Sequence, residues 1–163
     1  MNNIVLCGFM GCGKSTVGKN IARKSGRKFL DMDSYIEEKA GMTVSEIFEK
    51  YGEEKFRDME HDACVELAGL EGLVIASGGG AFTFKRNVEA FKGKDKIVFL
   101  DVPLRIIKSR LKNDTTRPLL QRPDRDRVMK DLYDSRYPIY HAAADIVGAG
   151  DTRVGVVLIV DSL

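Results

Sequence analysis

The chain has 163 residues, which is long enough for one substantial hydrophobic core but short for two domains. We therefore expect a single domain spanning residues 1–163. Hydrophobic residues make up 44% and charged residues 31%, the balance of a soluble globular protein rather than of a disordered one. No stretch approaches the ~18 consecutive apolar residues of a membrane span, and we expect no membrane partner. The net charge of +2 is too small to predict nucleic-acid binding.

A glycine-rich loop comes first along the chain. The apolar run Ile4–Cys7 predicts a strand and Thr16–Lys24 a helix, and the residues from Gly8 to Thr16 between them fit the spacing G-x4-G-K-S/T. Glycines let the loop turn its N–H groups toward phosphates, and the helix N-terminus favours negative charge. We expect Lys14 to reach the β- and γ-phosphates of a nucleotide and the Ser15 hydroxyl to ligate Mg2+.

The cysteines and the N-terminus indicate the compartment. Cys7, Cys12 and Cys64 lack the spacing of a metal site, as expected of reduced thiols in the cytoplasm. No basic region precedes the first apolar stretch, and cleaving that stretch as a signal peptide would destroy the phosphate loop. We therefore expect a cytoplasmic protein. Cys12, inside the loop, is either a reactive thiol or a small residue that fits there, and the second interpretation is favoured.

Strand-like and helix-like segments alternate along the chain, which predicts an α/β fold with a mainly parallel sheet and helices on both faces. The further predicted strands are Lys28–Leu30, Leu73–Ala76, Ile97–Leu100 and Asp145–Val147. Ligands of such sheets bind beyond the carboxyl ends of the strands. The first three strands are followed by Gly8–Ser15, Asp31–Asp33 and Ser77–Gly80, so these motifs should converge on one edge of the sheet.

Asp31 and Asp33 lie two residues apart after the second predicted strand. One carboxylate could orient metal-bound water while the other accepts or orients the proton of a substrate hydroxyl. In the alternative interpretation, one of them caps the helix that begins near Ser34.

A long helical insertion, Ser34 to Leu70, follows, with Gly41 and Gly52 as natural breaks. Within it Arg57 and Glu60 are three residues apart and able to pair, either as part of a site or as an ordinary surface pair. His61 is more simply a surface residue than a catalyst.

Three consecutive glycines, Gly78 to Gly80, indicate a close approach of other groups to the backbone, with a flexible loop as the alternative. The run Ile97–Asp101 resembles a Walker B segment, which would make Asp101 a metal ligand. Asp31 competes for that role, and Asp101 could equally cap a helix beginning near Pro103.

The last third of the chain is rich in arginine. Residues 112–127 are polar and lack apolar periodicity, which predicts a mobile lid whose arginines close over phosphates, or else a plain exposed loop. Basic residues between Arg105 and Arg136 fit an anionic small ligand or a solvated face better than nucleic acid. Arg136 shares a helical stripe with Met129 and Tyr140, so it should point inward toward a core carboxylate or a carboxylate ligand. The tail from Thr152 fits either a strand or a helix.

Together these residues resemble the shikimate kinase family over nearly the whole chain. The residues that carry the resemblance are Gly8–Thr16, Asp31 with Asp33, Phe56-Arg57 with Glu60, Gly78–Gly80, Arg117–Leu120, and Arg136 with Tyr140 and Ala144-Asp145. The resemblance implies a three-layer P-loop kinase fold with a five-stranded parallel sheet. It also implies a substrate-binding segment at about residues 33–61 and a lid at about residues 112–124. Family members usually carry a Glu where this chain has Ala142.

The resemblance implies an activity as well: ATP-dependent phosphorylation of the shikimate 3-hydroxyl, in aromatic amino-acid biosynthesis. We also expect the protein to be a monomer. Shikimate would be held by Asp33, Arg57, Gly79 and Arg136, with the arginines on its carboxylate and Asp33 on the reacting hydroxyl. ATP would be bound by Gly11, Cys12, Gly13, Lys14, Ser15, Thr16, Arg110, Arg117 and Arg153. Mg2+ would be held by Ser15 and, through water, by Asp31. The catalytic residues would be Lys14, Asp33 and Arg117.

Two other classes of function compete with this interpretation. A gluconate or nucleoside-monophosphate kinase could use the same scaffold, although paired arginines for a carboxylate disfavour a nucleotide acceptor. A nucleotide-dependent switch without turnover is the other alternative. The chain has no N-K-x-D guanine motif, and Asp33, Arg57 and Arg136 would be surplus in a pure switch.

Overall fold

Five parallel strands form the central sheet, in the order β2-β3-β1-β4-β5. The strands are β1 (Ile4–Cys7), β2 (Lys28–Asp31), β3 (Leu73–Ala76), β4 (Lys96–Leu100) and β5 (Ile146–Gly148). The computed structural model describes the chain from Met1 to Leu163 except for residues 116–117, 150–155, 157–158 and 161–162. The parallel five-stranded sheet expected from the sequence is confirmed, and each predicted strand lies within one residue of its observed position.

The one strand that shifts does so because of a side chain. Asp145, expected to begin the last strand, precedes β5: its backbone N–H donates to Ile97 O (2.8 Å), and its Oδ2 accepts from Ile97 N (2.9 Å). The carboxylate therefore occupies the position of a strand carbonyl, and the ladder with β4 begins one residue later, at Ile146.

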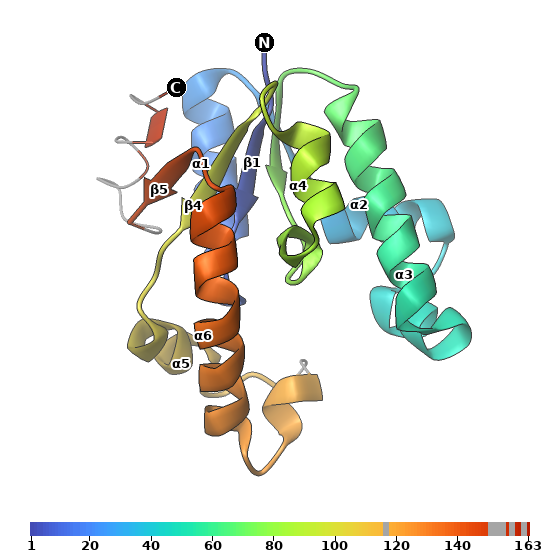
Figure 1. Ribbon diagram of the computed structural model, residues 1–163, viewed down its shortest axis with the longest axis vertical. Helices are drawn as coiled ribbons and strands as arrows, with labels where there is room; N and C mark the ends of the chain where they lie inside the picture. Colours follow the sequence, from blue (N-terminus) through green and yellow to red (C-terminus); the bar gives the residue numbers. More distant parts are fainter. Residues whose placement is uncertain (116–117, 150–155, 157–158, 161–162) are drawn as a thin grey trace.

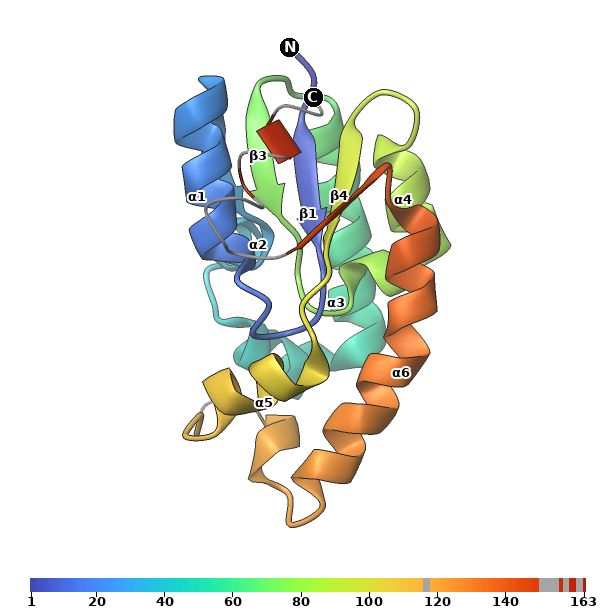
Figure 2. The same cartoon turned by 90° about the vertical axis from the view of Figure 1, so that its left-hand side faces the viewer.

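Helices cover both faces of the sheet, giving the three layers expected (Figures 1 and 2). They are α1 (Lys14–Ser25), α2 (Met32–Ala40), α3 (Val44–Ala68), α4 (Lys85–Phe91), α5 (Leu104–Leu111) and α6 (Arg125–Ala143), with short 3-10 turns at Ala81–Thr83 and Pro118–Gln121. Alternate side chains of β1 enter two separate cores. Ile4 and Leu6 pack with α1 and α5, whereas Val5 and Cys7 pack with α3 and α4.

The predicted helical insertion is formed by α2 and α3. Gly41 ends α2 with φ 69°, and Gly52, at φ 84° and ψ 170°, interrupts α3, so both predicted breaks are confirmed. A capping box between Thr43 and Glu46 starts α3. The positive φ of Gly41 and Gly52 favours glycine, because at such angles a Cβ would clash with the backbone.

The chain after β5 is described only in part. Val156 and Ile159 are buried in the core beside α1, and residues 156 and 159–160 are helical. In the part of the chain that the structure describes, no helix is both long enough and apolar enough to cross a membrane.

Candidate active site

A cavity of about 340 Å3 opens beyond the carboxyl ends of β1, β2 and β3. Its lining comes from all three predicted motifs: Met10, Gly11, Gly13, Lys14, Ser15 and Thr16 from the phosphate loop, Asp31 and Asp33 after β2, and Ser77 and Gly79 after β3. The predicted convergence on one edge is confirmed. Parallel strands impose it, since their carboxyl ends all lie on the same side of the sheet.

The phosphate loop leads directly into α1. Gly13, at φ 92°, precedes the helix, and no side chain caps the first N–H groups of α1. A helix start without a side-chain cap presents N–H donors and a positive dipole end, the requirements of a phosphate site. The loop is also held from outside, because Arg110 Nη1 donates to Gly11 O at 3.0 Å and Leu111 packs on Gly11.

Lys14 is folded back over the loop. Its Nζ donates to Gly8 O (2.8 Å) and Phe9 O (3.3 Å). The ammonium group is therefore tethered at the entrance of the loop, where incoming phosphates would compete with the two carbonyls for its protons.

Cys12 does not line the cavity. Its side chain is 1% exposed within the core, and its backbone N–H donates to Phe9 O at 3.1 Å. The interpretation as a small residue that fits the loop describes this position better than a reactive thiol, because thiolate chemistry needs access.

The two aspartates have different surroundings. Asp31 Oδ1 accepts from Ser34 N at 3.0 Å and caps α2, so the capping interpretation holds for Asp31, which also lines the cavity. Asp33 lies in the first turn of α2. Burial raises the pKa of Asp33, the Asp31 charge raises it further, and Lys14 and Arg57 oppose the shift. A carboxylate with a raised pKa binds a proton more readily, which suits a proton acceptor.

The glycine run is required by close contacts. A methyl group at Gly78 would lie 2.6 Å from Asp33 Oδ1, and one at Gly80 would lie 2.9 Å from Arg57 Nη2. At Gly79 a methyl group would meet nothing within 4 Å, and this residue lines the cavity. The close-approach prediction is confirmed: because Gly78 and Gly80 lack side chains, the Asp33 carboxylate and the Arg57 guanidinium can pack against the backbone next to Gly79.

A Gly78→Ala substitution tests this packing. We expect kcat to fall by about tenfold to a hundredfold, because the new methyl group displaces the Asp33 carboxylate and misplacement of a reacting group by about 1 Å can cost 10²-fold. The measurement is steady-state turnover alongside a thermal melt. Turnover equal to that of the parent would show that Asp33 tolerates the displacement. In a protein that already carries Asp33→Asn, adding Gly78→Ala should lower kcat no further.

Arg57 and Glu60 form a partly buried ion pair rather than an exposed surface pair. Arg57 Nη1 lies 3.0 Å from Glu60 Oε1, and the Glu60 side chain is 1% exposed. Burial raises the pKa of Glu60, and the Arg57 charge opposes the shift. The guanidinium carbon lies 5.4 Å and 5.1 Å from the ring centres of Phe56 and Phe84. These contacts fix Arg57 beside the cavity.

Arg136 approaches the same glycine run from α6. Its Nη1 donates to Gly79 O at 3.0 Å, and the Tyr140 hydroxyl donates to the same oxygen at 2.7 Å. The predicted inward arginine is thus half-buried and bound to a backbone carbonyl rather than to a core carboxylate. Arg57 and Arg136 flank the glycines from two different helices.

Other predicted residues lie elsewhere. His61 Nδ1 is 3.0 Å from Asn87 Oδ1, a structural contact outside the cavity. Asp101 accepts a hydrogen bond from Tyr137 and does not line the cavity. Arg117 of the expected lid and Arg153 of the expected adenine contact lie outside the described residues.

Sequence reasoning missed the aromatic residues that support the site. Phe84, beside Arg57, gives no local signal, because it comes from a segment far along the chain. Tyr133 and Tyr137 could have been noticed from their spacing of four residues, which places both on one helical face.

Two oxygen-bearing side chains in the cavity are of the kind that a magnesium ion prefers. The Ser15 hydroxyl and the Asp31 carboxylate line the same cavity as Lys14. Among the described residues no group of three or more His, Cys, Asp and Glu side chains could hold a metal by itself. Mg2+ typically takes one or two protein oxygens and completes its shell with water and substrate phosphates, so this small set is sufficient.

A cavity lined by a phosphate loop and a partly buried carboxylate, with two arginines at the glycine run beside it, defines a nucleotide-dependent kinase of small molecules. The family model described as "Shikimate kinase" matches residues 10–158. A shikimate kinase of Geobacter sulfurreducens is 45% identical over 144 residues, which are 88% of this chain and 79% of that protein. One of Clostridium botulinum is 40% identical over 157 residues, 96% and 93% of the two chains. The chain belongs to the shikimate kinase family.

Solved structures agree with this assignment. A shikimate kinase from Acinetobacter baumannii, solved in complex with shikimate, superposes with a TM-score of 0.90 at 39% identity over 99% of this chain and 92% of that one. A gluconokinase from Sinorhizobium meliloti superposes with a TM-score of 0.53 at 16% identity, a likeness of fold alone.

Proposed function

We propose that the chain transfers the γ-phosphoryl group of ATP to the 3-hydroxyl of shikimate, giving shikimate 3-phosphate and ADP in aromatic amino-acid biosynthesis. The observation that carries the proposal is that three side chains meet at one glycine run: Asp33 packs against Gly78, Arg136 donates to Gly79 O, and Arg57 packs against Gly80. An acceptor with a carboxylate and a reactive hydroxyl matches two cations and one proton acceptor.

The acceptor half of the reaction depends on three side chains. Arg57 and Arg136 would bind the shikimate carboxylate by charge-assisted, directional hydrogen bonds and so fix the orientation of the ring. Asp33 would accept the proton of the 3-hydroxyl as that oxygen attacks phosphorus. The main contribution of the protein is positioning, because phosphoryl transfer needs little covalent chemistry from it.

The donor half depends on the phosphate loop. The N–H groups at the start of α1 and the Lys14 ammonium would bind the phosphates, with Arg110 beside Gly11. Ser15 and, through water, Asp31 would hold Mg2+, which supplies charge neutralisation on the phosphates when bound. Arg117, in a lid at about residues 112–124, and Arg153 are proposed to complete the nucleotide site.

One assay tests the function. ADP release with Mg-ATP is measured with shikimate, gluconate or a nucleoside monophosphate as the acceptor, and we expect turnover with shikimate only. ADP released with gluconate or a nucleotide instead would identify another small-molecule kinase. Tight ATP binding with no acceptor-dependent ADP would indicate a nucleotide-binding module without turnover.

An Arg57→Lys substitution tests the carboxylate site. We expect the KM for shikimate to rise by about tenfold to a hundredfold, because a lysine ammonium cannot reproduce a forked bond to a carboxylate. The KM for ATP should stay close to that of the parent. Steady-state kinetics with each substrate varied in turn gives both values. An equal rise in the two constants would contradict the assignment of Arg57 to the carboxylate.

A further inference from the structure

Two tyrosines attach α6 to the carboxyl end of β4. The Tyr133 hydroxyl donates to Val102 O at 3.0 Å, and the Tyr137 hydroxyl donates to Asp101 Oδ2 at 2.7 Å. The tyrosines are one helical turn apart, and their acceptors belong to consecutive residues directly after the strand. One face of α6 is therefore tied to the edge of the sheet that carries the active site.

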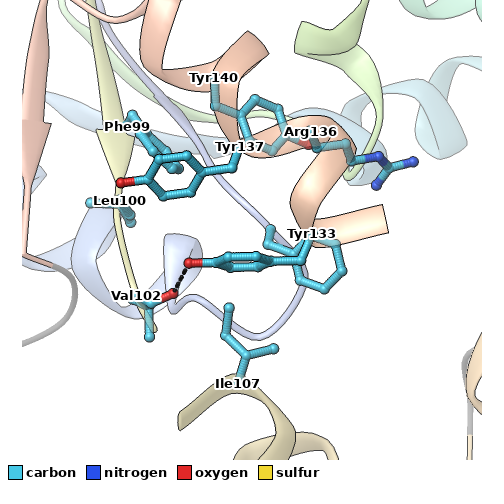
Figure 3. A pocket seen from close by; sticks show the side chains of 9 residues that line it. Phe99, Leu100, Val102, Ile107, Tyr133, Arg136, Tyr137 and Tyr140 are labelled. Carbon is cyan, nitrogen blue, oxygen red and sulfur yellow. Dashed lines mark hydrogen bonds between the residues drawn. The ribbon is translucent and has the colours of Figure 1, made fainter. Parts of the chain in front are cut away.

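The neighbouring face of α6 holds the carboxylate-binding group. Arg136, adjacent to Tyr137 in sequence, reaches Gly79 O at 3.0 Å. In Figure 3 the Arg136 guanidinium points away from the rings of Tyr133 and Tyr137, on the opposite side from Leu100 and Val102. A rotation of α6 about its axis, or a shift along that axis, would therefore move the guanidinium.

Ring packing leaves little freedom for that rotation. Tyr137 lies edge-on to Phe99, with ring centres 5.4 Å apart, and Tyr133 lies edge-on to Phe9 of the phosphate loop at 5.6 Å. The space enclosed among these side chains is about 10 Å3, room for one water at most (Figure 3). Close-packed groups transmit a displacement rather than absorb it.

The surroundings of Asp101 match neither of the two roles considered for it from the sequence. It does not line the cavity of the phosphate loop, and the Pro103 start of α5 carries no side-chain cap. Its carboxylate instead accepts a hydrogen bond from the Tyr137 hydroxyl. This bond raises the pKa of Tyr137, so the hydroxyl keeps its proton and remains the donor.

We propose that Tyr137 and Asp101 are positioning residues for Arg136. Their hydrogen bond fixes the turn of α6 on which Arg136 lies, and so holds the guanidinium at the distance from Gly79 that a bound carboxylate requires. The inference rests on the proposed function, since Arg136 is taken to bind the carboxylate of shikimate. Neither Tyr137 nor Asp101 touches a substrate in this scheme.

Tyr137→Phe removes the hydrogen bond and keeps the ring. We expect the KM for shikimate to rise by about five- to tenfold, the loss typical of one ordinary intramolecular hydrogen bond, with the KM for ATP within about twofold of the parent value. Asp101→Ala should give the same split, and Asp101→Asn, which keeps an oxygen acceptor, should restore most of the affinity. Ser135→Ala, which removes an exposed hydroxyl from the same helix, is the matched control and should change neither constant.

A double-mutant cycle shows whether Tyr137 acts through Arg136. In an Arg136→Ala background, adding Tyr137→Phe should leave the KM for shikimate unchanged, because the positioned group is gone. Additive losses, or equal changes in both KM values, would mean ordinary structural support and overturn the proposal. The proposal would also be overturned if Asp101→Ala needed more Mg2+ for activity and Tyr137→Phe did not, since that pattern marks a metal ligand. A parent protein inactive on shikimate refutes the proposed function itself, whereas an active parent with unaffected variants refutes only this inference.

Discussion

Replacing Asp33 by Asn should lower kcat by about 10²–10⁴-fold, the usual contribution of a positioned general base. The amide keeps the shape of the side chain and its place beside Gly78 but cannot accept the proton of the acceptor hydroxyl. Shikimate affinity should change much less than kcat, because Arg57 and Arg136 remain. A kcat within a few-fold of that of the parent would exclude Asp33 as the base.

The same substitution should stabilise the protein at neutral pH. The pKa of Asp33 is raised in the folded state, chiefly by burial and next by Asp31, so the folded chain holds a proton that the unfolded chain has already released. Between the ordinary aspartate pKa and the raised one, the free energy of unfolding of the parent therefore falls as pH rises, and above the raised pKa the loss is complete. Asp33→Asn removes this loss.

Thermal melts across the acidic range measure the effect. The parent should lose stability relative to Asp33→Asn as pH rises through the window between the two pKa values, and the variant should melt higher at pH 7. Asp131→Asn, which alters an exposed carboxylate near Arg127, serves as a control and should leave the profile unchanged. A variant less stable than the parent at pH 7 would show that Asp33 contributes favourable contacts that outweigh its desolvation.

Much of the fold is encoded in local sequence patterns. A buried strand and a phosphate loop are both predicted by one local pattern: the apolar run Ile4–Cys7, then a glycine-rich loop that ends at Lys14. Alternating strands and helices then fix a parallel sheet, and a parallel sheet brings the ends of its strands together. The fold and the place of the site could thus be predicted from local patterns.

Side-chain partners across long separations could not be predicted in the same way. Asp31 both caps α2 and lines the cavity, so the two competing interpretations of that residue are compatible. The bond from Tyr137 to Asp101 joins residues 36 apart and depends on how α6 docks, about which the run Ile97–Asp101 says nothing. The Arg57–Glu60 spacing predicted a pair, but its burial follows from packing that local spacing does not encode.

Replacing Lys14 by Met should lower kcat by about 10²–10³-fold, the cost of removing one donor aimed at charge that develops in the transition state. Methionine preserves the length and most of the volume of the side chain but carries no charge. In the structure the ammonium already lies at the loop entrance, bonded to Gly8 O and Phe9 O, so it needs only to exchange carbonyl oxygens for phosphate oxygens. Turnover under saturating substrates is the measurement.

Lys19→Met is the matched control, because Lys19 is an exposed residue of the same helix that lies over Phe29 and away from the loop. It should leave kcat unchanged. ATP should also raise the melting temperature of Lys14→Met less than that of the parent or of Lys19→Met, since a ligand stabilises in proportion to its binding free energy. Near-parental kcat in Lys14→Met would show that the amides at the start of α1 suffice to neutralise the phosphates. The loop would then be a binding element only, and transition-state charge would have to be neutralised by groups other than Lys14.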